Sequence, residues 1–304
     1  MKTTKQFTSK DGIAISYHSW LPEEKPVAVL QIAHGMAEFA DRYDDFANFL
    51  NKNKIAVYAN DHRGHGKTAG SLEKVGYFAK KDGWMKVVDD MRIFTDLIRK
   101  EHKNTPFFLL GHSMGSFLAR TYITKYDDID GVILSGTAQN PPAIIGAGKF
   151  MSFINSLFMN GHKASKFFDN MSFGSFNKPF EKEGPMSWLS RDKEEVKKYN
   201  DDPFCGFVCS LRFFRDLFSG LAYISKYKNN ENIRFTLPIY LIAGSQDPVG
   251  NNGEGPRKVA NTFRHWHIED VELNIYRGAR HEILNETNKQ DIYKDVLEWI
   301  NFRI

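Results

Sequence analysis

The sequence predicts an α/β fold in which a mostly parallel central sheet is flanked by helices and interrupted by one helical insertion. Three observations carry this prediction. Buried-strand patterns alternate with amphipathic helical patterns through the first 136 residues. The alternation stops at about Thr137 and resumes at Pro238. The chain has 304 residues, of which 41% are apolar, and this is enough for one large core that carries an insertion.

The strands of the predicted sheet are six short apolar runs. A turn at Ser9–Gly12 joins two further strands that precede them. Because helical patterns separate most of the apolar runs, we expect parallel pairing and right-handed crossovers. The six runs lie at Val27–Ala33, Ile55–Ala59, Phe107–Leu110, Val132–Leu134, Ile239–Ala243 and Val271–Tyr276.

The helices are predicted from apolar residues at helical spacing. One helix follows Tyr43, and a longer one runs from Trp84 to Ile98 with Asp82 as its expected N-cap. Another helix opens directly after the run that ends at Leu110. In the last helix, Thr287 and Gln290 have the spacing of a capping box.

The insertion spans residues 137–235, and segments 1–136 and 236–304 form the main domain around it. The insertion is rich in phenylalanine and has no buried-strand pattern, so we expect a helical cap over the strand ends, where open α/β sheets bind ligands. One series at helical spacing allows two interpretations, packing on the main domain or contact with a membrane surface. This series is Phe150, Phe153, Ile154, Leu157 and Phe158.

A serine lies at the turn between a predicted strand and a predicted helix, in Gly111-His112-Ser113-Met114-Gly115. This strand-turn-helix context is what a nucleophile elbow requires. The serine must adopt a strained backbone conformation, and the two glycines avoid clashes with neighbouring elements. The alternative, an idle serine in a turn of small residues, does not explain this context. We therefore predict Ser113 as a nucleophile.

A serine hydroxyl needs a base to take its proton. In a parallel sheet of this kind the partners follow in the order serine, acid, histidine, each after a strand end. Asp247 follows the strand that ends at Ala243, and His281 follows the strand that ends at Tyr276. We predict Asp247 as the acid and His281 as the base. Glu282 is the reserve acid, whereas Asp61 precedes the serine and is disfavoured.

The negative charge that develops on an attacked carbonyl oxygen requires two aimed N–H donors. One is expected from Met114, the residue after the nucleophile. The second is expected from Met36, in the loop after the first buried strand, where Gly35 lets the backbone turn. Both donors are backbone groups.

Five segments carry a resemblance to a known family. The chain resembles the monoacylglycerol lipase and lysophospholipase branch of the α/β-hydrolases, also described as serine aminopeptidase S33-type. The resemblance implies the α/β-hydrolase fold, ester hydrolysis through an acyl-enzyme on monoacylglycerols or lysophospholipids, and a structural role for the segment that begins at Asp61. Ser116 and Thr68 depart from the family's usual glycine and serine. The five segments are His34-Gly35-Met36-Ala37-Glu38 with Arg42-Tyr43 after it, Asp61-His62-Arg63-Gly64-His65-Gly66, Gly111-His112-Ser113-Met114-Gly115, Gly244-Ser245-Gln246-Asp247-Pro248-Val249 and Gly278-Ala279-Arg280-His281-Glu282.

Two other functions stay open at this point. An aminopeptidase of the same fold would use the same three residues and would need a carboxylate in the cap to hold the substrate ammonium. Glu181, Glu183, Glu194 and Glu195 are available for that role. A non-catalytic protein that only binds a ligand is the second alternative, and the intact set of catalytic residues argues against it.

Composition limits the partners. The net charge is +4, from 41 basic and 37 acidic residues that are scattered, so we expect no nucleic-acid partner. The mechanism requires no metal and no organic cofactor. Cys205 and Cys209 are expected to be reduced thiols. The N-terminus lacks the pattern of a secretory signal and no apolar run reaches about 20 residues, so we expect a cytoplasmic protein. The oligomeric state stays open.

Overall fold

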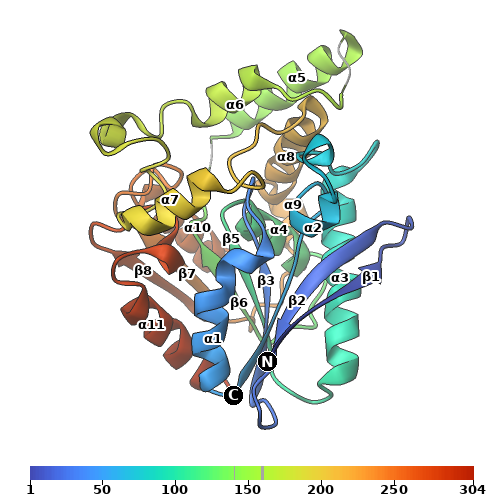
Figure 1. Cartoon of the computed structure of the whole chain (residues 1–304). Coiled ribbons are helices and arrows are strands. Elements are labelled where there is room, and N and C mark those ends of the chain that lie inside the picture. Colours follow the sequence, from blue (N-terminus) through green and yellow to red (C-terminus); the bar gives the residue numbers. More distant parts are fainter. Residues whose placement is uncertain (140, 159–160) are drawn as a thin grey trace.

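The computed structural model describes residues 1–139, 141–158 and 161–304, and its centre is one eight-stranded sheet (Figure 1). The strand order is β1-β2-β4-β3-β5-β6-β7-β8. β2 pairs antiparallel with β1 and β4, and all other neighbours are parallel. The predicted mostly parallel sheet is therefore confirmed. The strands are β1 (Lys2–Thr8), β2 (Ala14–Trp20), β3 (Ala28–Ala33), β4 (Ile55–Asn60), β5 (Phe107–His112), β6 (Gly131–Ser135), β7 (Ile239–Gly244) and β8 (Val271–Tyr276).

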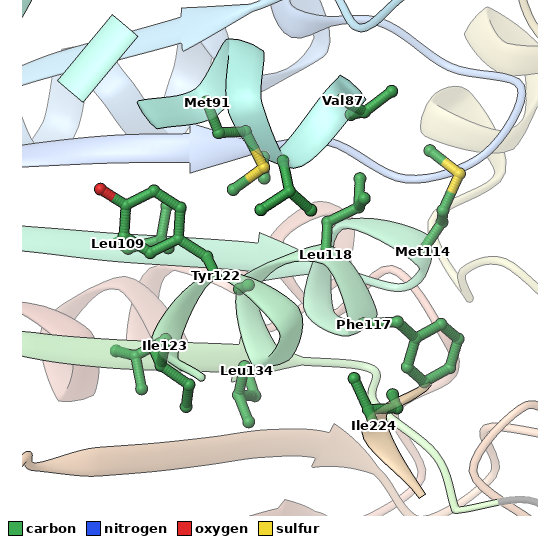
Figure 2. Packing of buried hydrophobic residues seen from close by; sticks show 14 of the residues in the cluster. Val87, Met91, Leu109, Met114, Phe117, Leu118, Tyr122, Ile123, Leu134 and Ile224 are labelled. Atoms are coloured by element: carbon green, nitrogen blue, oxygen red, sulfur yellow. The ribbon is translucent and has the colours of Figure 1, made fainter. Parts of the chain in front are cut away.

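Helices cover both faces of the sheet and bury its central strands. β3, β4, β5, β6 and β7 are buried at every position, which explains their nearly continuous apolar sequences. α1 (Asp44–Lys52) and α11 (Lys289–Asn301) pack on one face, while α3 (Gly83–Glu101), α4 (Met114–Ile123) and α10 (Glu254–His265) pack on the other. Figure 2 shows Leu118 and Tyr122 of α4 on the side nearest Met91 of α3.

Of the two predicted helix caps, the one at Asp82 is confirmed in position only, and the capping box at Thr287 is wrong. Asp82 does occupy the N-cap position of α3, but its φ is 53° and its side chain makes no capping hydrogen bond. α11 begins after Asn288, so Thr287 lies outside the cap. The Thr287 N–H instead donates to the Glu286 carboxylate, at 3.0 Å. At the start of α3 the Gly83 N–H is bonded to the carboxylate of Asp216, a residue of another helix, in place of Asp82.

The chain between β6 and β7 carries helices α5 to α9. They are α5 (Pro142–Phe158), α6 (Lys166–Phe173), α7 (Lys193–Asp201), α8 (Leu211–Ile224) and α9 (Tyr227–Asn230). α8 packs against α3, α4 and α5, while α5 and α6 gather at one end of the sheet (Figure 1). Of the described residues here, the only β-pairing is an isolated bridge between Ala164 and Ser210. The division of the chain at residues 137 and 236 stays a prediction.

Among the described residues, five short helical segments complete the secondary structure, three in the first part of the chain and two later. α2 (Gly66–Ala69) is one turn, and 3₁₀ turns lie at Ala40–Tyr43, Leu72–Lys74, Lys178–Glu183 and Ile283–Asn285. None of the helices in the described ranges combines the length and the apolar character needed to cross a bilayer. The cytoplasmic location stays a prediction.

Candidate active site

Ser113 lies on a sharp turn between β5 and α4. Its φ of 51° and ψ of −117° are values that residues with a side chain rarely adopt. Such a conformation costs on the order of 1–3 kcal/mol and persists only when the surroundings hold it. Two hydrogen bonds do so: the Ser113 N–H donates to Ser135 O at 2.9 Å, and the Ser116 hydroxyl donates to Ser113 O at 2.6 Å. Ser116, one of the two departures from the family pattern, thus supports the turn.

The two glycines of the turn have a steric cause. A Cβ on Gly111 would overlap the carbonyl of Gly115, at the start of α4. A Cβ on Gly115 would overlap the carbonyl of Ala33, at the end of β3. The helix therefore approaches the sheet as closely as its backbone allows.

Asp247 and His281, from loops after β7 and β8, meet in a buried hydrogen bond. The His281 Nδ1 lies 3.0 Å from the Asp247 Oδ1, which also accepts the Val249 N–H at 2.9 Å. Asp247 has no exposed surface. Burial alone would lower the pKa of His281, but the Asp247 carboxylate outweighs burial and raises it above the ordinary value. Because Nδ1 is engaged by Asp247, Nε2 is left to accept a proton.

Ser113 and His281 line the same cavity, which has a volume of about 330 Å³. Among the described residues no hydrogen bond joins the Ser113 hydroxyl to His281. Such bonds are often loose in hydrolases without substrate and tighten when substrate binds. The ring of His112 lies 4.8 Å from the ring of His281, and both residues line the cavity. The assignment of nucleophile, base and acid stays a prediction.

The two expected oxyanion donors flank Ser113. Gly35 and Met36 line the cavity, and a Cβ on Gly35 would lie 3.3 Å from the Ser113 Cβ. No backbone hydrogen bond of the described turns and loops uses the Met36 N–H. Met114 opens α4, where the first N–H groups have no partner within the helix. The Met36 and Met114 N–H groups are therefore available to donate hydrogen bonds to a ligand.

A buried ionic network joins the Met36 loop to the His281 loop, and sequence reasoning missed it. Arg42 donates to Glu38 at 3.0 Å and to both carboxylate oxygens of Glu282 at 2.5 and 2.7 Å. Glu38 in turn accepts the Gly35 N–H at 2.5 Å. Burial alone would raise the pKa of Glu282, but the Arg42 guanidinium outweighs burial and lowers it to about 2. Glu282, the reserve acid, is thus occupied by Arg42.

The segment Asp61–Gly66 makes hydrogen bonds that support neighbouring loops, which is the structural role that the resemblance implies. The Asp61 carboxylate accepts the N–H groups of Ala40 and Lys67 at 2.8 and 2.7 Å. Thr68, the second departure from the family pattern, donates its hydroxyl to Asp61 O at 2.8 Å. These bonds tie the loop after β3 to the loop after β4.

The cap supplies the remaining walls of the cavity. Phe173, Trp188 and Phe207 bring aromatic surface, and Asp169 brings a carboxylate whose pKa burial raises. The four cap glutamates considered for an aminopeptidase do not line this cavity. Glu183, for example, pairs with Arg280 at 2.6 Å. Sequence reasoning missed Asp169, which no motif marks.

No metal site is built into the described ranges: no group of three or more His, Cys, Asp or Glu side chains is arranged there to hold an ion. Cys205 and Cys209 are free and buried.

The sheet order, the strained serine and the Asp247–His281 pair define an α/β-hydrolase. A carboxyl esterase from Bacillus coagulans has the same fold, with a TM-score of 0.89 and 28% identity over 99% of this chain and 98% of its own. The chain belongs to the family described as serine aminopeptidase, S33, whose family model matches residues 24–288. It is therefore a hydrolase.

Two curated relatives cover nearly the whole chain. The monoglyceride lipase of Mus musculus is 28% identical over 97% of this chain and 89% of its own length. The monoacylglycerol lipase of Mycolicibacterium smegmatis is 26% identical over 98% of this chain and 97% of its own length.

Proposed function

We propose that this protein is a serine carboxylic-ester hydrolase that acts on monoacylglycerols or lysophospholipids through an acyl-enzyme. The observation that carries the proposal is the buried Asp247–His281 hydrogen bond beside the cavity that holds Ser113 in its strained turn. A serine without a function would not explain why the chain keeps a backbone conformation that costs free energy.

The proposed reaction has two halves, and His281 moves the proton in both. His281 Nε2 takes the Ser113 proton while the Ser113 Oγ bonds to the ester carbonyl carbon. The Met36 and Met114 N–H groups donate to the resulting oxyanion. When the carbonyl re-forms, the bond to the alcohol oxygen breaks and His281 returns the proton to the leaving alcohol. Water then attacks the acyl-enzyme in the same way, and Ser113 leaves.

The substrate class is proposed from the cavity walls and from the relatives. Phe173, Trp188 and Phe207 offer an apolar wall to an acyl chain, and each buried CH₂ contributes about 0.8 kcal/mol. Tyr199 lines the same cavity, and its hydroxyl, which donates to Ala37 O at 3.1 Å, can still accept a hydrogen bond from an alcohol. A monoacylglycerol has both parts, and two relatives are lipases of that substrate by name.

A hydrolysis panel tests the substrate class. It compares monoacylglycerols, lysophospholipids, short esters and aminoacyl amides at equal concentration, with the Ser113→Ala variant as the blank. We expect the first two groups to give the highest kcat/KM. Labelling by a fluorophosphonate separates this enzyme from a non-catalytic binding protein, because only an activated serine reacts. A chain that is not labelled would reject the proposed function.

An aminopeptidase is the second candidate because Asp169 brings a cap carboxylate to the cavity. A carboxylate in a largely apolar cavity favours a cationic group such as a substrate ammonium. The Asp169→Asn variant tests this: an aminopeptidase would lose its aminoacyl amide hydrolysis, whereas a lipase would keep its activity on neutral esters. Higher kcat/KM for aminoacyl amides than for monoacylglycerols would favour the second candidate.

The cap is also proposed to contact a lipid surface transiently. Four large apolar side chains of α5 are exposed, although α5 packs on α8 with its other face. Lys149 is the one charged residue in the α5 sequence, and Arg215 lies beside Phe153. An apolar face with basic neighbours suits a membrane interface. The four exposed side chains are Ile144, Phe150, Phe153 and Ile154, whereas the side chains of Leu157 and Phe158 lie outside the described residues.

A further inference from the structure

His34, which precedes the Met36 loop, has both ring nitrogens engaged although the proposed reaction does not use it. The ring has no exposed surface. Its Nε2 lies 2.9 Å from the His62 backbone N, and its Nδ1 lies 2.7 Å from Gly35 O. A backbone N–H can only donate, so Nε2 accepts. The ring proton is therefore on Nδ1, which donates to the Gly35 carbonyl.

The ring keeps this single arrangement over the working pH range. Burial is the largest influence and lowers the pKa of His34 to about 3. A neutral imidazole carries one N–H donor and one acceptor, and here the His62 N–H decides which nitrogen is which. The Asp61–Gly66 segment, which has no catalytic role in the proposed reaction, thus selects the tautomer of His34.

The Gly35 carbonyl and the Met36 N–H belong to one peptide group. This peptide is trans and close to planar, so the two groups point in opposite directions. A donor that holds the carbonyl on one side therefore aims the N–H to the other side. Gly35 itself restricts the peptide little, because it has no Cβ. Its N–H is held separately by Glu38, at 2.5 Å.

We propose that His34 is a positioning residue that holds the Gly35–Met36 peptide with its N–H toward the oxyanion. Without the Nδ1 donor the peptide is free to turn, and the Met36 N–H then no longer points toward the oxyanion. The proposal rests on the proposed function, because an oxyanion forms only when Ser113 attacks an acyl carbon.

Two variants of similar size separate this role from general support of the loop. In His34→Asn the side-chain NH₂ takes the place of Nδ1 and still donates to Gly35 O. In His34→Gln the amide reaches the place of Nε2, accepts the His62 N–H and leaves Gly35 O without a donor. Both variants lose the imidazole ring that lies 4.2 Å from the ring of His62.

The expected result is a difference in kcat between the two variants. His34→Gln should lose about 10²- to 10³-fold in kcat with little change in KM, as when one oxyanion donor is removed. His34→Asn should stay within about tenfold of the wild type. A trifluoromethyl ketone, which forms a tetrahedral adduct with Ser113, should lose affinity for His34→Gln in step with kcat/KM, while its methyl ketone parent should not.

Equal kcat in the two folded variants, or His34→Gln within threefold of the wild type, would overturn the proposal. The proposed function would survive that result if Ser113→Ala is inactive and the wild type is labelled by the fluorophosphonate. If His34→Gln does not fold, nitrogen chemical shifts of His34 in the wild type decide. We expect a proton on Nδ1 from about pH 5 to 9, and a proton on Nε2 would refute the proposal.

Discussion

The sheet and the cap differ in how their residues are used. Strands β3 to β7 are buried at every position, whereas α5 in the cap leaves most of its apolar residues exposed. Ser113, Asp247 and His281 follow β5, β7 and β8, while the cap contributes walls such as Phe173 and Phe207. The buried sheet thus holds the residues of the proposed chemistry, whereas the more exposed cap lines the cavity in which the substrate is proposed to bind. Changes at the strand ends should affect every substrate, and changes in the cap should affect only some.

The largest effect is expected at Ser113. Ser113→Ala should lower kcat by about 10⁵-fold or more on every ester, because the nucleophile is lost. The fold should remain, since the two hydrogen bonds that hold the turn use the main chain of residue 113. Esterase kinetics and thermal unfolding measure the two quantities. If Ser113→Ala lost activity on only some esters, changes at the strand ends would not affect every substrate. The proposed difference between sheet and cap would then be wrong.

The Asp247–His281 pair should set the pH dependence. His281 acts as a base only when neutral, so kcat/KM should rise with pH and reach half of its plateau above 6.5, the ordinary pKa of histidine. Asp247→Asn should lower kcat by about 10⁴-fold and move the midpoint down, because the carboxylate that raises the pKa is gone. A pH–rate profile of both proteins measures this, and an unchanged midpoint would show that Asp247 does not act on His281.

The strand ends were predictable because topology brings them together. The carboxyl ends of parallel strands meet at one edge. The strand-turn-helix pattern at Gly111–Gly115 therefore predicted Ser113, and the order of the later strands predicted Asp247 and His281. The Arg42–Glu282 pair was not predictable, because the two residues are 240 positions apart and no pattern links them. Asp169 was missed for a related reason: in the cap, irregular loops decide which side chains face the cavity, and periodicity says nothing about them.

A smaller effect is expected at Arg42, whose side chain joins the loop after β3 to the loop after β8. Arg42→Leu leaves the buried Glu38 and Glu282 carboxylates unpaired and should cost about 3–5 kcal/mol of the free energy of unfolding. Arg92→Leu is the matched control, because Arg92 also bridges two carboxylates but is 31% exposed, and it should cost about 1 kcal/mol or less. Urea unfolding measures both. Equal losses would mean that the buried network contributes no more than a surface pair.

The same network should make stability depend on pH. The pKa of Glu282 is lowered from 4.5 to about 2 in the folded chain, so its contribution is present above pH 4.5 and is lost as the pH falls toward 2. Arg42→Leu should flatten this part of the stability curve. A wild-type curve that is already flat between these values would contradict the assignment.

The smallest effect is expected on the exposed face of the cap. Phe150 is 65% exposed on α5, and Phe150→Ser should weaken binding to anionic phospholipid vesicles by several-fold, since burying such a side chain contributes about 1.5–3 kcal/mol at most. Hydrolysis of a short water-soluble ester should not change, because Phe150 does not line the cavity that holds Ser113 and His281. Phe302→Ser is the control: Phe302 is 86% exposed at the C-terminal end of α11, away from the cap, and its loss should leave vesicle binding intact. Equal losses in the two variants would mean that the cap has no special affinity for lipid, and the cap would then serve only to shape the cavity.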